Sequence, residues 1–398
     1  MEGPAPVSAP PRPAVADESG RRTPDLLYDD TEQTLRESIR SLLVARCGAD
    51  DILRRVESDD TCDTGLWQAI AADLGCAGLL IPEDDDGAGA SYREAALVAE
   101  ELGRAVAPVP FLGSAVVATT ALLAAGDHTR LAELARGDVT AALAVGFGTR
   151  PGAPFPDAVR VSGSRAGDGT SGLTRLRGRV PGVADALTAD LLIVPADGAP
   201  SGLYLVGAGA EGVRRTPVIS LDMTRQLCDL DLEDAPARLI ASGPAAGRAV
   251  GDALAAGAAL LASELLGVAD RCLEMTVAYV KERRQFARPV GSFQALKHRL
   301  ADLWVGVTQA RAAARYAAAC LAAGDGDAPV ATALAKAYCG EIALRAAEEC
   351  VQMHGGIGFT WEHPAHLYLK RAKSASIAFG TAGAHRAALA GLVNLPGA

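Results

Sequence analysis

Glycines near the end of the chain have the spacing of an anion-binding turn. Gly355, Gly356 and Gly358 interrupt a long Ala-rich region that is otherwise helical in pattern. Glycine lets the backbone turn where side chains would clash, and it leaves backbone N–H groups free to bind an anion. A Gly-Gly-x-Gly sequence alone is more often an ordinary turn between two helices. A second segment is therefore needed to favour binding.

Such a segment lies upstream. It begins at Arg283 and reads Arg283-Arg284-Gln285-Phe286, followed by Gly291-Ser292-Phe293-Gln294. The planar guanidinium of Arg283 suits a pyrophosphate, because its fork of donors matches two oxygens at once. A charged cluster at residues 281–284 is also what a solvated helix end looks like. The two segments together predict a site for a flavin nucleotide.

These residues resemble the acyl-CoA dehydrogenase family. That family carries an R-x-Q-F-G…F-Q segment, then Q-x-x-G-G-x-G…E-x-P, and then a catalytic glutamate followed by Gly-Thr. The match from Glu362 to Thr381 needs no gap, and the position of the glutamate falls on Phe379. Ala287 stands where the family has glycine, which we expect to be a mild change because alanine fits most helical or turn positions.

The resemblance implies FAD as the cofactor and no metal. In the family, the arginine and the glycine pair reach a flavin that is bound mainly by the neighbouring chain. The resemblance assigns the cofactor contacts to Arg283, Phe286, Gln294, Gln352, Gly355, Gly356 and Thr381. Two family segments near the flavin ring, Thr-Glu-Pro…Gly-Ser-Asp and an aromatic followed by Ile/Val-Thr, have no match at residues 144–149 and 178–182.

The base that would remove the α proton of a substrate is missing from its usual place. Phe379 cannot accept a proton, and its neighbours Ala378 and Gly380 are not acids. Some family members place the glutamate on the long helix before the arginine segment. Counted back without a gap, that position falls near Gly257 or Ala258, and neither can serve as a base.

Three residues are weaker candidates for the base. Glu264 follows Gly257 by seven residues, so it lies on roughly the same helix face but about 10 Å further along the axis. His354 lies inside the glycine-rich segment, and His385 follows Thr381 by one helical turn. Either ring can titrate near neutral pH. Such a glutamate is more often structural, and such a histidine is more often a hydrogen-bonding spacer.

Three hypotheses follow from the missing glutamate. The chain is an FAD-dependent acyl-CoA or acyl-carrier dehydrogenase that introduces an α,β double bond into an acyl thioester, using a base from elsewhere. Alternatively, it is a base-less partner subunit that completes the flavin site of a heteromeric acyl-CoA dehydrogenase, or a scaffold repurposed for a non-redox reaction or ligand binding. If the rest of the site is intact, Phe379→Glu should restore α-proton exchange of a bound thioester.

Composition limits the class of protein. The chain has 398 residues, 49% of them hydrophobic, which is enough for two or three domains. A net charge of -10 argues against a broad nucleic-acid-binding surface. The eight cysteines show no disulfide or metal spacing, and we find no signal peptide or membrane span in the sequence. We expect a cytoplasmic homo- or hetero-oligomer with an electron-transfer partner.

The order of elements agrees with an α+β, acyl-CoA dehydrogenase-like fold. Short apolar or alternating runs at residues 139–145, 159–162, 173–180, 190–196, 203–206 and 227–232 predict a compact antiparallel domain or barrel. Before and after it, apolar residues recur at helical spacing. We expect a disordered leader at 1–24, an N-terminal helical domain at 25–135, a central β-barrel domain at 136–240 and a C-terminal four-helix-type bundle at 241–398.

Overall fold

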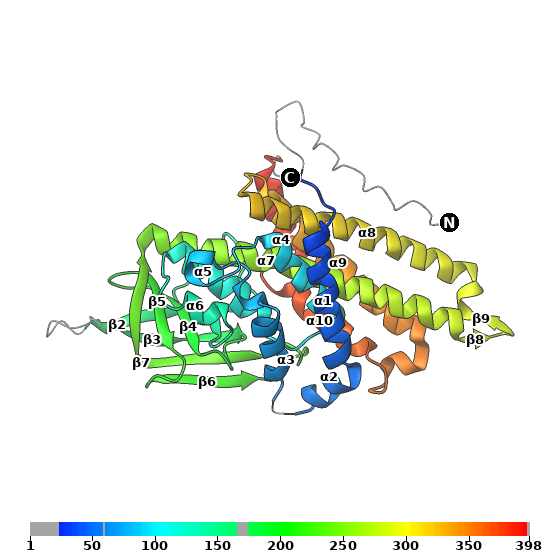
Figure 1. Cartoon of the computed structure of the whole chain (residues 1–398), viewed down its shortest axis with the longest axis horizontal. Helices are drawn as coiled ribbons and strands as arrows, with labels where there is room; N and C mark the ends of the chain where they lie inside the picture. The colour runs from blue at the N-terminus through cyan, green and yellow to red at the C-terminus, as the bar shows by residue number, and fades with distance from the viewer. Residues whose placement is uncertain (1–23, 59, 165–173, 396–398) are drawn as a thin grey trace, which may run out of the picture.

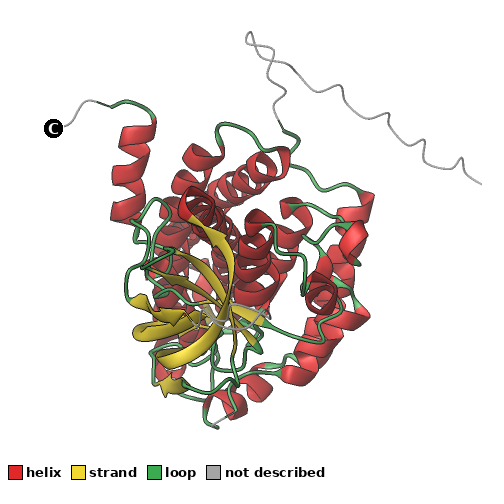
Figure 2. Cartoon of the chain, turned by 90° about the vertical axis from the view of Figure 1, so that its left-hand side faces the viewer, coloured by secondary structure: helices red, strands yellow, loops and turns green. Residues whose placement is uncertain are grey.

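A computed structural model of the chain describes residues 24–58, 60–164 and 174–395. Apart from residue 24, the expected leader lies outside the described residues. Helices come first along the chain, then the strands of one main sheet, then long helices (Figure 1). The sheet lies at one end of the molecule, and the long helices extend away from it (Figures 1 and 2).

The N-terminal helices start at strong capping signals. Asp29 and Glu32 form a capping box at the first helix, and Ser91 and Glu94 form another at the fourth. The elements of this part are α1 (Asp30–Arg46), α2 (Ala49–Val56), α3 (Thr64–Gln68), η1 (Ala69–Asp73), η2 (Cys76–Gly78), η3 (Glu83–Asp85), α4 (Tyr92–Ala105), η4 (Phe111–Ala118), α5 (Thr119–Ala125) and α6 (Leu131–Ala135).

The central strands form an open sheet rather than the expected closed barrel. Its order is β1-β4-β5-β7-β3-β2, with β6 paired to β7, so β1 and β2 are its two ends. β1 runs parallel to β4, and the other pairings are antiparallel. The strands are β1 (Ala141–Leu143), β2 (Val159–Ser164), β3 (Thr174–Ala184), β4 (Leu191–Ala196), β5 (Gly202–Gly207), β6 (Val213–Val218) and β7 (Leu227–Ser242).

The C-terminal part is built on α7 (Gly243–Glu282), against which α8 (Gln294–Ala323) and α9 (Ala328–His354) pack. By length and composition α7 could cross a membrane, but 83% of its most apolar window is buried inside the protein, as in a core helix. The remaining elements are β8 (Arg284–Gln285), β9 (Arg288–Pro289), η5 (Val290–Ser292), η6 (Gly355–Phe359), α10 (Ala365–Ile377) and α11 (Ala382–Leu392).

Two glycines let α4 lie directly on α7. A Cβ added to Gly103 would lie 2.0 Å from the carbonyl oxygen of Glu264, and one added to Gly267 would lie 1.9 Å from that of Glu100. Real side chains cannot make such contacts, so only glycine permits this helix spacing. The close approach fixes the N-terminal helices on the C-terminal bundle, and it places Glu264 in the interior.

Candidate functional site

The arginine segment and the double-glycine bend lie together at one end of the bundle. Tyr279, in the last turn of α7, stacks on His354, the last residue of α9, with ring centroids 4.3 Å apart. Arg283 follows Tyr279 by one turn and donates its backbone N–H to the carbonyl of that residue. Gly355 follows His354 directly. The fold therefore brings together the two segments that sequence analysis paired, and we call this region the tip.

The tip carries a strained hairpin. β8 and β9 pair in register, and the two residues between them, Phe286 and Ala287, have φ of 52° and 63°. Two positive φ values are the pattern of a type I′ turn, which normally takes Asn-Gly. The expectation that Ala287 is a mild change was wrong, because a left-handed backbone costs an alanine roughly 1–2 kcal/mol. Such strain is typically kept where a site needs it.

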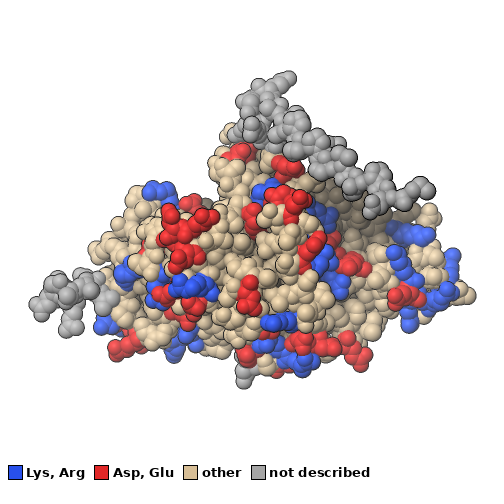
Figure 3. Space-filling model, viewed as in Figure 1, with Lys and Arg blue, Asp and Glu red and all other residues tan. Residues whose placement is uncertain are grey.

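Aromatic and basic side chains of the hairpin face outward. Phe286 is 86% exposed, and its ring meets the edge of Phe293 at 6.1 Å between centroids. The guanidinium of Arg288 lies over the other aromatic ring, Phe293, at 3.9 Å. Figure 3 shows Lys and Arg side chains gathered at the end of the molecule where Figure 1 has β8 and β9. This end is suited to an anionic and partly aromatic partner.

The tip fits the anionic part of a dinucleotide. Arg283 is exposed and makes no ion pair with a carboxylate among the residues that the structure describes. Gly355 has a φ of 62°, so its left-handed backbone explains why glycine stands there. Gly356 does not have a positive φ, and a Cβ added to it would meet no atom within 4 Å. Nothing in the described part of this chain requires glycine there, so close approach of another molecule is its simplest reason. Gln294 and Gln352 are exposed at the same end.

Thr381 lies far from the other six predicted cofactor residues. It caps α11, accepting a hydrogen bond from the N–H of Ala384 at 3.3 Å. Its neighbour Gly380 is held by Lys336 on α9, whose ammonium donates to the Gly380 carbonyl at 3.1 Å. Lys336 precedes His354 by 18 residues, which is about 27 Å of helix. One chain therefore offers two separate parts of the predicted site.

Phe379, where the resemblance places the family's glutamate, closes a small cavity. It packs edge-on against Phe147, and its backbone N–H donates to the Phe147 carbonyl at 2.8 Å. A Cβ added to Gly257 would lie 2.9 Å from the Phe379 ring. The remaining cavity is about 20 Å³, the size that holds one water. This cavity is too small to hold a substrate.

Asp185 is the one acid among the described residues that line this cavity. It is buried, with φ of 58°, and its carboxylate accepts the Gly113 N–H at 3.1 Å. Burial raises the pKa of Asp185 to about 6, against the pull of Arg225 and Arg371. The raised pKa depends on burial between distant segments, so the sequence alone did not identify Asp185.

A buried ionic network lies beside the cavity and joins the three parts of the chain. Arg371 on α10 contacts Glu264 at 2.8 Å and Asp222 at 3.0 Å, and it donates to the carbonyl of Thr224 at 2.8 Å. Arg225 forms the second ion pair of Glu264. Asp222, Thr224 and Arg225 belong to the segment between β6 and β7, so the network ties the sheet to the bundle.

The ends of the chain match two models of one family. Residues 29–138 match the acyl-CoA dehydrogenase N-terminal domain, and residues 247–392 match the acyl-CoA dehydrogenase C-terminal domain. The acyl-CoA dehydrogenase IpdE2 of Mycobacterium tuberculosis is 37% identical over 345 residues, which is 86% of this chain and 91% of that protein. The chain belongs to the acyl-CoA dehydrogenase family. This confirms the expected family and fold. It also confirms the expected enzyme class, which is the FAD-dependent oxidoreductases that act on acyl thioesters.

Solved structures of acyl-CoA dehydrogenases share the fold. The ChsE4-ChsE5 complex from Mycobacterium tuberculosis is similar with a TM-score of 0.81 and 27% identity, over 94% of this chain and 100% of that one. A variant of the Tcur3481-Tcur3483 steroid ACAD is similar with a TM-score of 0.79 and 29% identity, over 92% and 98%. The helical, sheet and bundle parts described above are thus arranged as in this family.

None of the three weaker candidates for the base is free to act as one. Both carboxylate oxygens of Glu264 are held by arginines; burial opposes ionisation, but Arg225 and Arg371 lower its pKa overall. His354 donates Nδ1–H to the Cys350 carbonyl at 2.6 Å and lies at the tip, far from Phe379. His385 donates Nε2–H to the Phe379 carbonyl at 2.9 Å, and burial lowers its pKa. All three have structural roles.

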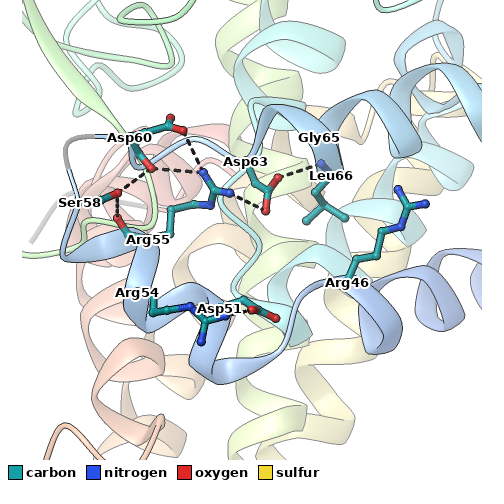
Figure 4. Close-up of a pocket in the computed structure, with 9 residues that line it drawn as sticks. All are labelled: Arg46, Asp51, Arg54, Arg55, Ser58, Asp60, Asp63, Gly65 and Leu66. Atoms are coloured by element: carbon teal, nitrogen blue, oxygen red, sulfur yellow. Dashed lines mark hydrogen bonds and ion pairs between the residues drawn. The ribbon is translucent and has the colours of Figure 1, made fainter.

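Another concavity lies elsewhere, on the N-terminal helices. It measures about 580 Å³ and is lined mainly by Arg and Asp side chains (Figure 4). Arg55 pairs there with Asp60 and Asp63, and Arg54 pairs with Asp51. Because these charges satisfy one another on an open surface, we interpret the concavity as solvated and ion-paired rather than as a site.

Proposed function

We propose that this chain acts as the base-less subunit of a mixed acyl-CoA dehydrogenase. Its tip completes the FAD site of a related chain that carries the catalytic glutamate. The assembly introduces the α,β double bond into an acyl thioester, on coenzyme A or a carrier, in the cytoplasm, and an electron-transfer partner reoxidises the flavin. The assignment of the base to one chain and of further FAD contacts to the other goes beyond membership of the family.

The separation of the tip from Phe379 carries the proposal. Gly257, next to the Phe379 ring, lies on α7, and Arg283 directly follows the end of that helix, 26 residues or about 39 Å further along. A dinucleotide held by Arg283 therefore cannot place its ring beside Phe379 of the same chain. The place beside Phe379 is also closed. The tip of this chain carries residues that can bind the dinucleotide. The place where a catalytic base would stand is occupied by the Phe379 ring.

The residues of the tip suit the FAD pyrophosphate. Arg283 would donate a bidentate pair of hydrogen bonds, and the backbone N–H groups around Gly355 and Gly356 would supply further donors. Gln294 and Gln352 would position the rest of the dinucleotide tail. Bound FAD would supply the acceptor for the β hydride. The related chain must supply the base for the α proton and the donors to the thioester carbonyl.

Similar structures support a mixed assembly. The ChsE4-ChsE5 structure is described as a complex of two differently named proteins, and the steroid ACAD is named as a pair, Tcur3481-Tcur3483. In a two-fold dimer of identical chains, the same surface patch of each chain meets the other, and two chains of one fold can associate in the same way. We therefore expect the partner to be another family member rather than an unrelated protein.

The experiment is purification of this chain alone, of a glutamate-bearing family member encoded beside it, and of the two together. Flavin content and bleaching by an acyl thioester are measured for each. We expect this chain alone to be colourless, and the pair to hold flavin and to bleach. A yellow, thioester-bleached protein from this chain alone would show a self-sufficient enzyme. If neither this chain alone nor the pair gains flavin through this chain, the hypothesis of a repurposed scaffold is the better one.

A further inference from the structure

Two buried cysteines lie one helical turn below the tip. Cys272 on α7 and Cys350 on α9 are far apart in the chain, and both are fully buried and outside any disulfide. The two helices pack along one another, and the thiol of Cys272 hydrogen-bonds to that of Cys350. Cys350 precedes His354, the last residue of α9, by one turn. The fold thus makes a pair of thiols that the spacing of cysteines in the sequence does not show.

We propose that Cys272 and Cys350 are a redox-active dithiol, which a hydroperoxide oxidises to a disulfide, and that this disulfide weakens the hold of the tip on FAD. The oxidation is a property of this chain by itself, whereas its effect on FAD rests on the proposed function. The dehydrogenation proposed above uses neither sulfur. The pair is therefore a second reactive site rather than a part of the first.

The surroundings of Cys350 are those of a reactive thiolate. Its sulfur lies 3.6 Å from Nδ1 of His354. The hydrogen bond from Cys272 lowers the pKa of the Cys350 thiol; burial opposes this, and contacts with His354 and Thr276 lower the pKa further. Burial lowers the pKa of His354, but contacts with Cys350 raise it overall, as in a thiolate–imidazolium pair. The thiolate is the form of cysteine that attacks an oxidant.

Other thiols of the chain have the opposite surroundings. Burial raises the thiol pKa at Cys47, Cys62, Cys76, Cys228 and Cys339. Such cysteines behave as small apolar side chains. Burial also raises the pKa of Cys272, and its neighbour Cys350 raises it further. The pair thus combines one thiolate, which attacks the oxidant, with one thiol, which closes the disulfide.

The oxidation takes place in two steps. The Cys350 thiolate attacks one oxygen of the hydroperoxide: the S–O bond forms, the O–O bond breaks, and a sulfenic acid remains while an alcohol leaves, or water where the oxidant is hydrogen peroxide. The sulfur of Cys272 then attacks the Cys350 sulfur, so the S–S bond forms, the S–O bond breaks and water leaves. The two sulfurs give two electrons to the O–O bond, and the two thiol protons leave with the two oxygens.

A disulfide at this level changes the support of both segments of the tip. Arg283 follows Cys272 by 11 residues, which is about 16 Å of helix, and Gly355 follows Cys350 by five residues. Hydrogen-bonded thiols keep their sulfurs apart by a van der Waals contact, whereas a disulfide brings the two sulfurs to about 2 Å. The helices α7 and α9 must therefore move relative to one another, and the two segments of the tip move with them.

The rings above the pair also depend on the reduced state. His354 lies between Tyr279 and His363, with ring centroids 4.3 Å and 4.2 Å away. A sulfur in a disulfide carries no negative charge, so the imidazole of His354 loses the contact that raises its pKa. Gly355 follows His354 directly, so a shift of this ring also displaces the backbone N–H groups of the double-glycine bend.

The first test uses this chain alone, reduced and then treated with hydrogen peroxide. Free thiols are blocked, and mass spectrometry of the peptides measures which cysteines are oxidised and how fast. We expect a Cys272–Cys350 cross-link that forms at least about tenfold faster than oxidation of Cys339, the matched buried thiol on α9. In Cys272→Ala, dimedone should trap the sulfenic acid of Cys350. Absence of the cross-link, or oxidation of the pair no faster than that of Cys339, would overturn the dithiol.

His354→Phe tests the activation of Cys350. Phenylalanine keeps a ring between Tyr279 and His363 but removes the nitrogen beside the sulfur. We expect the cross-link to form at least about tenfold more slowly, because less of the thiol is ionised. Circular dichroism should show the helix content of the parent. An unchanged rate of oxidation would overturn the role given to His354.

The second test measures the flavin affinity of the pair formed with the glutamate-bearing chain. This chain is oxidised or left reduced before mixing, and Cys272→Ala/Cys350→Ala, which cannot be cross-linked, is the control. We expect the disulfide to weaken flavin binding at least about tenfold, a typical coupling between two sites, and dithiothreitol to restore it. The double variant should bind flavin equally before and after peroxide. Equal affinity of the reduced and oxidised parent would overturn the link to the tip.

Failure of this inference is distinguishable from failure of the proposed function. If the cross-link forms but the pair holds no flavin in either state, the proposed function is wrong and the dithiol stands. If the pair holds flavin but no cross-link forms, the dithiol is wrong and the proposed function stands.

Discussion

The ring of Phe379 occupies the space into which a side chain at Gly257 would point. A Cβ added to Gly257 would lie 2.9 Å from the Cζ atom of Phe379. The resemblance places the family's glutamate at Phe379 or, in other members, near Gly257 or Ala258, and the structure brings Phe379 and Gly257 together. In this chain the space at Gly257 is filled by the aromatic ring of Phe379.

Phe379→Glu alone should not restore α-proton exchange. The sequence suggested a restored site, but the cavity beside residue 379 is about 20 Å³ and cannot admit an acyl thioester. Exchange of a short-chain acyl thioester in deuterated water, followed by mass spectrometry, should stay at the level of the matched variant Phe379→Leu. A rise of orders of magnitude would show that the cavity opens to substrate.

Ala287→Gly should relax the hairpin and stabilise the protein by up to about 1 kcal/mol. Relief of a left-handed alanine outweighs the entropy that glycine loses on folding. The measurement is the urea midpoint of unfolding. Ala301→Gly is a matched control at an exposed interior position of α8, where glycine should cost about 1 kcal/mol. Equal destabilisation by both changes would mean that the hairpin is unstrained.

Arg371→Met should destabilise the fold by about 3–5 kcal/mol, because it leaves Asp222 and Glu264 buried without their shared partner. Arg386→Met is the control, since Arg386 pairs with Glu341 at the exposed surface and such pairs contribute less than about 1 kcal/mol. Chemical unfolding of both variants gives the comparison. Similar small losses would mean that the buried network does not join the sheet to the bundle.

The stability of Asp185→Asn relative to the parent should rise with pH. The pKa of Asp185 is raised from 3.8 to about 6 in the folded protein. The folded state thus binds this proton more tightly than the unfolded chain does. As pH rises from 3.8 through 6, the unfolded chain loses the proton more readily, so the free energy of unfolding of the parent falls. The variant lacks this cost, so its advantage should grow by up to about 3 kcal/mol between pH 4 and 7.

Glu264→Gln gives the opposite dependence. The pKa of Glu264 is lowered, so its contribution is present above the ordinary value of 4.5 and is lost as pH falls through the folded value. The deficit of the Gln variant should therefore shrink on acidification. The free energy of unfolding of both variants is measured with urea at several pH values. If the stabilities of the parent and of Asp185→Asn changed with pH in parallel, the raised pKa of Asp185 would be contradicted.

The helices and the tip could be predicted because their signals are local. The apolar stripe of α7, the arginine segment and the double-glycine bend were each visible in sequence, and the fold brings them together. β6 was missed because Arg214, Arg215 and Pro217 make it polar and exposed; as an edge strand it pairs only with β7. This strand therefore gave no apolar pattern to detect.

The ionic network and the filled cavity depend on contacts between distant segments. Asp222, Glu264 and Arg371 are spread over 149 residues, and no local pattern pairs them. One signal was available: Glu264 stands inside the long apolar stripe of α7, where a lone acid needs a buried partner. That signal identifies a structural ion pair better than it identifies a base.

The most direct test of the account is the flavin affinity of the mixed pair when Arg283 of this chain is replaced by glutamine. Arg160→Gln, at an exposed position of β2, serves as the control. The glutamate-bearing chain is left unchanged. We predict that Arg283→Gln weakens flavin binding by roughly 10–100-fold, as for loss of hydrogen bonds to a charged group, while Arg160→Gln has no effect. Unchanged flavin affinity with Arg283→Gln would contradict the claim that this chain completes its partner's site.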